Sequence, residues 1–214
     1  PARTFNVGIA DVVPKLIAYH LLEPALSLPE PIQISCHEDP QEALLADLAI
    51  HKLDLVLTDR PLESHLHVRA YSHLLGISNL SFFCVPDQAE EYRRGFPESL
   101  DNAPLLMPAP STQIHTDLKR WLDQQRVYPR IIGEFADSAL MKTFGQAGVG
   151  IFSAPSVIAK AVARQYRVEE IGSTKKVRER FYAISTERHI RHPATLAVCN
   201  QGRVSLFERE STSD

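Results

Sequence analysis

Apolar and amphipathic stretches alternate along the first sixty residues. Three apolar runs, at 4–10, 32–36 and 53–57, predict strands, and the last of them is apolar enough for a strand buried on both faces of a parallel sheet. Helical stripes fill the two gaps. The first stripe consists of Val13, Leu16, Ile17 and Leu21. The second follows Asp39, Pro40 and Glu42, where Asp39 is the expected helix cap. The order is strand-helix-strand-helix-strand, which predicts an α/β fold.

The same alternation returns in the second half of the chain. Strands are expected at 66–75, 77–85, 103–107, 130–135, 149–152 and 181–185. One helix is expected after Ser111 as its cap, with the stripe Ile114, Leu118, Trp121 and Leu122. Further helices are expected at 139–146 after Asp137 as cap, around 157–162, and at 193–207. The chain therefore contains two α/β units of similar design, and no long linker separates them.

The ends of the expected strands are the places to look for a ligand. In open α/β sheets, ligands bind outside the carboxyl ends of strands and beside helix N-termini. Two such units are expected to face each other across a cleft. The loops selected by this rule are 11–14, 36–39, 58–61, 108–113, 137–138 and 152–155.

Charge and composition narrow the class of protein. The 214 residues carry a net charge of −3, whereas a domain that binds DNA by neutralising phosphates is usually strongly basic. No apolar run approaches the roughly 18 residues that cross a bilayer, and the first residues lack the pattern of a signal peptide. The three cysteines, Cys36, Cys84 and Cys199, are far apart, as in a protein with reduced thiols. We expect a cytoplasmic protein.

The sequence contains no GxSxG, Walker loop, GxGxxG or HExxH motif. The glycines of 145–150 follow an expected helix and lead into a strand, which is the reverse of the dinucleotide-binding order, so a turn is expected there. His65 and His67, with His73 nearby, have no Cys or carboxylate at metal-ligand spacing, which favours loop histidines over a metal site.

Acidic residues follow several of the expected strands. Asp11, Asp59 and Asp137 are placed to cap helices, whereas Glu38 stands beside a residue that already does so. Together, such carboxylates would offer oxygen ligands to a hard cation or repel an anion. Ser111, Thr112 and Gln113 either cap a helix or bind a carboxylate or phosphate through hydroxyl and backbone N–H groups.

Several blocks resemble the effector-binding domain of LysR-type transcriptional regulators. The blocks HKLDLVLTDRP (51–61) and GEFADSALMKTFGQAGVGIFSAP (133–155) carry the family's strand and turn patterns. A closer resemblance, to the sodium-responsive NhaR-type activators of antiporter genes, adds the blocks 7–15 and 187–200. The blocks occur in matching order over nearly the whole chain.

The resemblance implies a type II periplasmic-binding-protein-like fold, in which two Rossmann-like α/β subdomains surround a cleft and two crossover segments join them. Subdomain I is expected at 1–80 with 186–214, and subdomain II at 81–185. The family also implies a homodimer through this domain, a tetramer of the full-length parent, contact with RNA polymerase, and DNA binding through an N-terminal winged helix-turn-helix. We expect that DNA-binding domain to lie outside these 214 residues.

Effector-binding residues follow from the same resemblance. It places them at Asp11, Val12 and Val13, at Ser111 and Thr112, and at Phe152 and Ser153, and the strand-end acids Glu38, Asp59 and Asp137 are added to this set. Asp11 stands where many relatives have a small hydroxyl residue, which disfavours a carboxylate inducer and favours a cation. Asp11, Glu38 and Asp59 are accordingly the candidates for a sodium site.

The function expected from the sequence is that of an effector-sensing regulatory domain, responsive to Na⁺, with no catalytic residue and no cofactor. A small organic acid or an amino acid is the effector expected if sodium is not. A soluble solute-binding protein or a small α/β enzyme would share the fold, and both are less favoured by the sequence.

Overall fold

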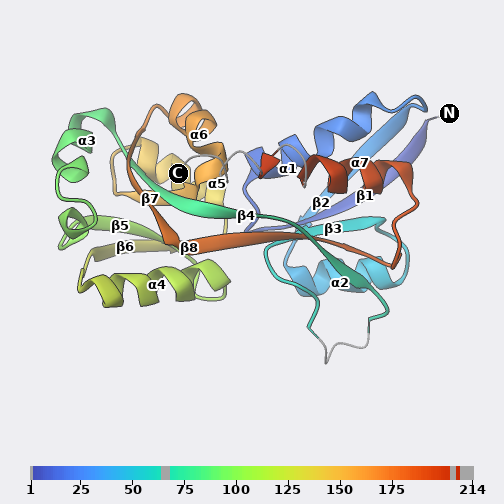
Figure 1. Cartoon of the computed structure of the whole chain (residues 1–214), viewed down its shortest axis with the longest axis horizontal. Coiled ribbons are helices and arrows are strands. Elements are labelled where there is room, and N and C mark those ends of the chain that lie inside the picture. Colours follow the sequence, from blue (N-terminus) through green and yellow to red (C-terminus); the bar gives the residue numbers. More distant parts are fainter. Residues whose placement is uncertain (1, 64–67, 203–205, 208–214) are drawn as a thin grey trace. The chain divides into compact units, whose positions relative to one another are not determined.

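Two α/β units make up the chain. The computed structural model describes residues 2–63, 68–202 and 206–207. Unit 1 lies within 1–77 and 180–214, and unit 2 within 78–179. The strands β4 (Tyr71–Cys84) and β8 (Glu169–Ser185) pass from one unit to the other (Figure 1). Within the described residues, no helix is both long and apolar enough to cross a bilayer.

The sheet of unit 1 is built around its first strand. β1 (Arg3–Ala10) pairs in parallel with β2 (Ile32–Asp39) and with β3 (Leu55–Thr58). In this register Ile9 is opposite both Glu38 and Leu57. β3 also pairs antiparallel with the last part of β8, and all four of its residues are buried. The near-continuous apolar run in the sequence is therefore a buried strand, as predicted, but the sheet around it is mixed rather than purely parallel.

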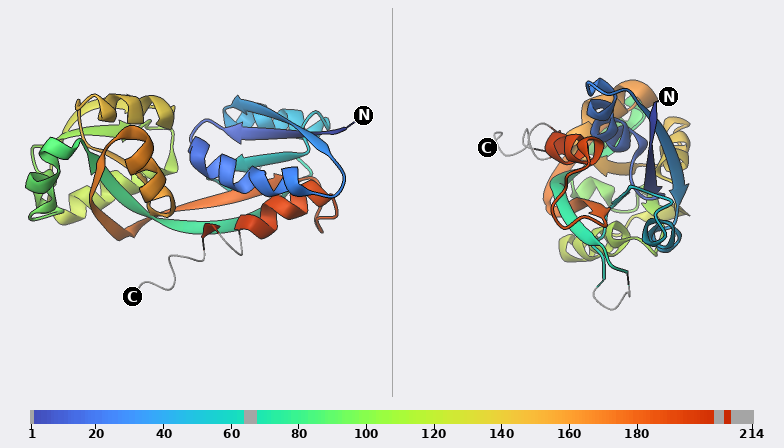
Figure 2. Two further views of the ribbon diagram at one scale, coloured as in Figure 1. Left: turned by 90° about the horizontal axis from the view of Figure 1, so that it is seen from above. Right: turned by 90° about the vertical axis from the view of Figure 1, so that its right-hand side faces the viewer.

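Helices cover both faces of this sheet. α2 (Gln41–Ala49) lies on one face, while α1 (Lys15–Leu22) and α7 (Pro193–Gln201) lie on the other (Figures 1 and 2). A short 3₁₀ helix, Glu23–Ser27, follows α1. The apolar stripes expected from the sequence face the sheet, and their buried members include Ile17, Leu21, Leu44 and Leu48.

Unit 2 packs its helices on a smaller sheet. β5 (Pro104–Pro108) pairs in parallel with β6 (Arg130–Phe135), and β7 (Phe152–Pro155) pairs antiparallel with β4. Figure 1 shows α4 (Gln113–Gln125) on one side of β5 and β6, and α5 (Ser138–Gln146) and α6 (Ala159–Tyr166) on the other. α3 (Pro86–Arg93) follows β4. In the core, the Phe82 ring stacks on Trp121 with centroids 5.6 Å apart.

Two long strands differ from the sequence prediction. The separate strands expected at 66–75 and 77–85 are one strand, β4, within the described residues; 66 and 67 lie outside them. Gly76 lies within this strand, and its missing side chain makes room for the Phe207 ring: an added Cβ would lie 2.1 Å from the Phe207 Cγ. β8 starts at Glu169 rather than at 181, since exposed charged residues alternate with the buried Ile171 and Val177.

Several element ends were also predicted wrongly. β2 continues through Asp39, and Pro40 precedes α2 without a side-chain cap bond, so Asp39 is not the cap. α4 is capped by Thr112 rather than Ser111. β7 begins at Phe152 instead of 149. The α-helical part of α7 ends at Gln201, Gly202 and Leu206 are π-helical, and 203–205 lie outside the described residues, so the predicted helix end at 207 stays a prediction. α3 was not predicted, because only one of its residues is buried and its apolar pattern is therefore weak.

Candidate functional site

Three of the predicted acidic residues belong to one edge of the unit 1 sheet. Asp11 follows β1, Glu38 is the last residue but one of β2, and Asp59 follows β3. Because these strands run parallel and in register, their carboxyl ends meet at the same edge. We call this the carboxyl edge of unit 1.

The turn after β1 is held by its own backbone. The Val13 N–H donates to the Ala10 carbonyl oxygen at 2.9 Å, and the Val13 side chain is buried. Val12 is half-buried, and Asp11 is exposed at the tip of the turn. The turn therefore presents Asp11 to solvent while Val13 anchors it to the core.

Glu38 is joined to the helix that follows this turn. The Lys15 Nζ donates to the Glu38 Oε1 at 3.0 Å, and both side chains are about half exposed, at 54% and 50%. An exposed pair of this kind contributes about 0–1 kcal/mol to stability. It costs little to open, so a ligand at this edge can compete for either partner.

Asp59 is the most buried carboxylate of the three. Only 6% of its side chain is exposed, and the Arg60 Nε lies 3.9 Å from its Oδ1. Burial raises the pKa of the Asp59 carboxyl, and the Arg60 charge and a backbone hydrogen bond offset only part of that effect. Asp59 therefore holds its proton more tightly than an ordinary aspartate does.

A buried polar clamp, not expected from the sequence, positions the loop that carries Asp59. The Thr58 Oγ1 donates to the Gln41 Oε1 at 2.5 Å, and both residues are buried. The Arg60 N–H donates to the same Thr58 hydroxyl at 3.3 Å. Thr58 thus ties the end of β3 to the first residue of α2. The sequence signal that could have revealed this contact was a threonine at the end of an apolar strand and a glutamine at the start of a helix.

The carboxyl edge does not contain a ready-made metal cage. Within the described part of the chain, no group of three or more His, Cys, Asp or Glu residues could hold a metal ion. His65 and His67 lie outside the described residues. The His73 Nε2 is 3.3 Å from the Glu187 carbonyl oxygen, which gives this imidazole a structural partner.

The start of α4 carries the hydroxyl pair predicted in unit 2. The Thr112 Oγ1 accepts from the His115 N–H at 3.2 Å and donates to the Ala109 carbonyl at 2.7 Å. The adjacent Ser111 is exposed. The His115 Nε2 lies 3.2 Å from the Glu134 Oε2 and joins α4 to β6. The Thr112 hydroxyl is thus engaged in the cap, and Ser111 is the exposed member of the pair.

The other three candidate residues, Asp137, Phe152 and Ser153, have structural roles in unit 2. Asp137 caps α5, as predicted, because its Oδ1 accepts from the Ala139 N–H at 2.8 Å. Phe152 is fully buried and stacks on Phe83 with ring centroids 5.4 Å apart. Ser153 is buried in β7, opposite Phe82.

The glycines of 145–150 form a turn, as predicted. Gly145 lies in α5, where an added Cβ would be 2.2 Å from the Phe152 Cδ1, and Gly148 has a φ of +81°. A side chain is therefore excluded at Gly145 by packing and disfavoured at Gly148 by its left-handed backbone.

Comparison with known proteins identifies the family of this chain. A model of the LysR substrate binding domain matches residues 1–203. The chain belongs to the LysR substrate-binding domain family. It is 36% identical to the transcriptional activator protein NhaR of Escherichia coli over 203 residues, which are 95% of this chain and 66% of NhaR. The chain therefore spans just under two thirds of that relative, which is named as a regulator rather than an enzyme.

Solved LysR regulatory domains share the fold. The regulatory domain of HypT from Salmonella typhimurium, in its apo form, aligns with a TM-score of 0.68 at 14% identity and covers 94% of both chains. The CcmR regulatory domain from Synechocystis PCC6803, solved in complex with 2-PG, aligns with a TM-score of 0.67 at 13% identity and covers 95% of this chain and 97% of that one. These matches confirm the predicted fold class.

Replacing Asp59 with asparagine is expected to make the domain more stable at neutral pH. A raised pKa means that the fold favours the protonated carboxyl, so this contribution to stability is present below the ordinary pKa near 3.8 and is lost as the pH rises through the raised value. Asparagine does not ionise, so the Asp59→Asn variant does not lose this stability as the pH rises. Urea unfolding at pH 7 and at pH 3.5 measures the free energy of unfolding of the variant and of the wild type. The gain of the variant over the wild type should be larger at pH 7. The exposed Asp39→Asn variant is the control. A variant that is equally destabilised at both pH values would contradict the role given to burial.

Proposed function

We propose that this LysR domain is the effector-sensing part of a DNA-binding transcriptional activator of the NhaR type. The family match over residues 1–203 and the 36% identity to NhaR support this assignment most strongly. The parts of NhaR that the chain does not match leave room for a winged helix-turn-helix that binds DNA. Contact with RNA polymerase and a cytoplasmic location belong to the same proposal, and no catalytic residue is assigned.

Units 1 and 2 are proposed to be the regulatory subdomains I and II, with β4 and β8 as the two crossover segments. Signalling would be a shift of population. An effector that prefers one arrangement of the domain favours that arrangement in the whole regulator. A coupling of about 1–3 kcal/mol gives a 5- to 150-fold change in DNA affinity or activation.

Sodium is the first effector proposed, and the carboxyl edge of unit 1 is its proposed place. Na⁺, like other hard cations, takes several oxygen ligands from carboxylates and backbone carbonyls. Asp11 is exposed there, and the Glu38 carboxylate is paired with Lys15 across a weak, exposed contact. Because no preformed cage exists among the described residues, binding requires the Lys15–Glu38 pair to open.

A small organic anion is the second proposed effector. The Lys15 ammonium at the carboxyl edge attracts an anion. In unit 2, the exposed Ser111 at the start of α4 is a separate candidate position for an anion. The CcmR domain of the same fold was solved with 2-PG. In this case the anion would compete with Glu38 for Lys15.

Sodium is expected to raise the melting temperature of the domain selectively. A ligand that binds only the folded state, present at ten times its Kd, stabilises by about 1.4 kcal/mol, which is about 3–6 °C for a chain of this size. Thermal unfolding is measured in NaCl, KCl and choline chloride at equal ionic strength. Asp11→Asn and Glu38→Gln should abolish the difference between salts, whereas Glu98→Gln on the exposed surface of unit 2 should retain it.

Identical melting curves in the three salts would contradict sodium sensing by this domain. A panel of organic anions that includes 2-PG then tests the second effector. If an anion binds there, Lys15→Gln should remove its stabilising effect and Asp11→Asn should not.

Exposed apolar side chains in unit 2 support the proposed homodimer. Those on β6 and α5 are between 41% and 50% exposed: Ile131, Ile132, Leu140 and Phe144. Exposed apolar area of this kind is costly in water and typical of a protein interface. A second copy of the chain is its proposed occupant, since the family acts as oligomers.

The variant Leu140→Glu is expected to shift the domain from dimer to monomer. A charge buried in an apolar interface is desolvated on association and weakens it by about tenfold or more. Sedimentation velocity at micromolar concentration measures the mass, and Gln146→Glu, an exposed position on the same helix, is the control. Wild-type domain that is strictly monomeric under these conditions would contradict the dimer.

A further inference from the structure

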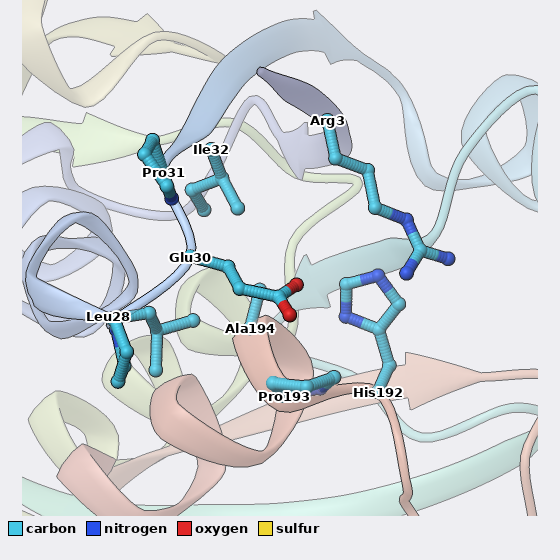
Figure 3. A pocket seen from close by; sticks show the side chains of 9 residues that line it. Arg3, Leu28, Glu30, Pro31, Ile32, His192, Pro193 and Ala194 are labelled. Atoms are coloured by element: carbon cyan, nitrogen blue, oxygen red, sulfur yellow. The ribbon is translucent and has the colours of Figure 1, made fainter. Parts of the chain in front are cut away.

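Unit 1 contains a cavity that the proposed function does not use. Its volume is about 270 Å³, and it lies between the start of β1, the segment before β2 and the start of α7. Leu28, Ile32 and Pro193 give it an apolar wall, and Arg3, Glu30 and His192 bring polar groups to it (Figure 3). It thus has the mostly apolar lining with a few polar groups that is typical of small-molecule sites.

This cavity is far from the carboxyl edge. Arg3 and Ile32 are the first residues of β1 and β2 and are opposite each other in the sheet. Asp11 follows the last residue of β1, and a strand rises by about 3.3 Å per residue, so about 23 Å separate the two ends. A ligand in the cavity would therefore not touch the proposed effector residues of unit 1.

The imidazole of His192 has an unfilled hydrogen-bonding position in the cavity wall. Its Nδ1 is buried and has no hydrogen-bond partner among the described residues. The ring stacks on Phe5 with centroids 5.3 Å apart, and the His192 backbone N–H donates to the Glu187 Oε2 at 3.3 Å. Buried polar groups in proteins are nearly always paired, so this nitrogen points to a group not supplied by the described chain.

Opposite charges flank the imidazole. Figure 3 shows the Arg3 guanidinium and the Glu30 carboxylate both reaching toward the His192 ring. Arg3 and Glu30 are exposed, so each remains accessible to a ligand that enters the cavity. Ala194 also lines the cavity, and it lies in the first turn of α7. The partial positive charge of this helix N-terminus, together with Arg3, attracts an anion.

We propose that this cavity binds a small zwitterion, an α-amino acid with an apolar side chain, as a second ligand site of the domain. The carboxylate is bound by Arg3 and the start of α7. The ammonium group donates to Glu30 and to the Nδ1 of His192, which gains the partner that it lacks. The apolar side chain packs against Leu28, Ile32 and Pro193. The site is independent of the effector proposed above.

L-leucine is the probe for a first test, used with the whole 214-residue chain. Amide chemical shifts locate the binding, and isothermal titration measures the affinity. Isocaproate lacks the ammonium group and isoamylamine lacks the carboxylate. Each is expected to bind at least about tenfold more weakly than L-leucine, because one charge-assisted contact is lost. Shifts are expected at Arg3, Ile32 and Ala194.

Variants of the two exposed charged residues complete the test. Arg3→Gln and Glu30→Gln should each weaken L-leucine binding by about tenfold or more without unfolding the domain, as circular dichroism verifies. Lys52→Gln, an exposed position elsewhere in unit 1, is the matched control and should bind as the wild type does.

Three results would overturn the proposal. They are the absence of L-leucine binding at its solubility limit, equal binding of isocaproate, and L-leucine shifts confined to Asp11–Val13. The last result would place the amino acid at the carboxyl edge instead. None of these results depends on the sodium response of the domain, so failure here is separate from failure of the proposed function.

Discussion

The parallel pairing of β1 with both β2 and β3 is the constraint on which the proposed site depends. It aligns Ile9 with Glu38 and with Leu57, so the three strands end together. A change of register would move Asp11, Glu38 and Asp59 away from one another. The Thr58–Gln41 hydrogen bond then fixes the end of β3 against α2. Because β3 is fully buried, it gives the edge a rigid base. The site is thus a consequence of how the core of unit 1 is paired.

The candidate polar groups of this domain serve stability as well as recognition. Thr112 and Asp137 cap helices, Glu38 pairs with Lys15, and Asp59 is largely buried beside Arg60. Asp11 and Ser111 are exposed, and so are the paired Glu38 and the capping Asp137. An effector that binds at the carboxyl edge would replace contacts of small energy, and this is the condition under which a modest ligand can shift a population.

Patterns with a clear period were readable from the sequence, and contacts between distant residues were not. The stripe of Ile114, Leu118 and Trp121 faces the core as predicted, and β6 has its predicted bounds. The strands expected at 66–75 and 77–85 are one strand, and the sequence does not reveal that Phe207 packs on Gly76 between them. The shared edge of Asp11, Glu38 and Asp59 followed from topology. The Thr58–Gln41 clamp and the cavity beside His192 arise from tertiary contacts that no local pattern reports.

Hydrogen–deuterium exchange of the whole chain tests most directly whether the carboxyl edge of unit 1 senses an effector. Exchange is compared in NaCl and choline chloride at equal ionic strength, and again with 2-PG. The account predicts slower exchange in 11–15 and 58–61 with one of these ligands, because the loops that end β1 and β3 become ordered around it. Unchanged exchange in both segments with both ligands, or protection confined to the residues around His192, would contradict the account.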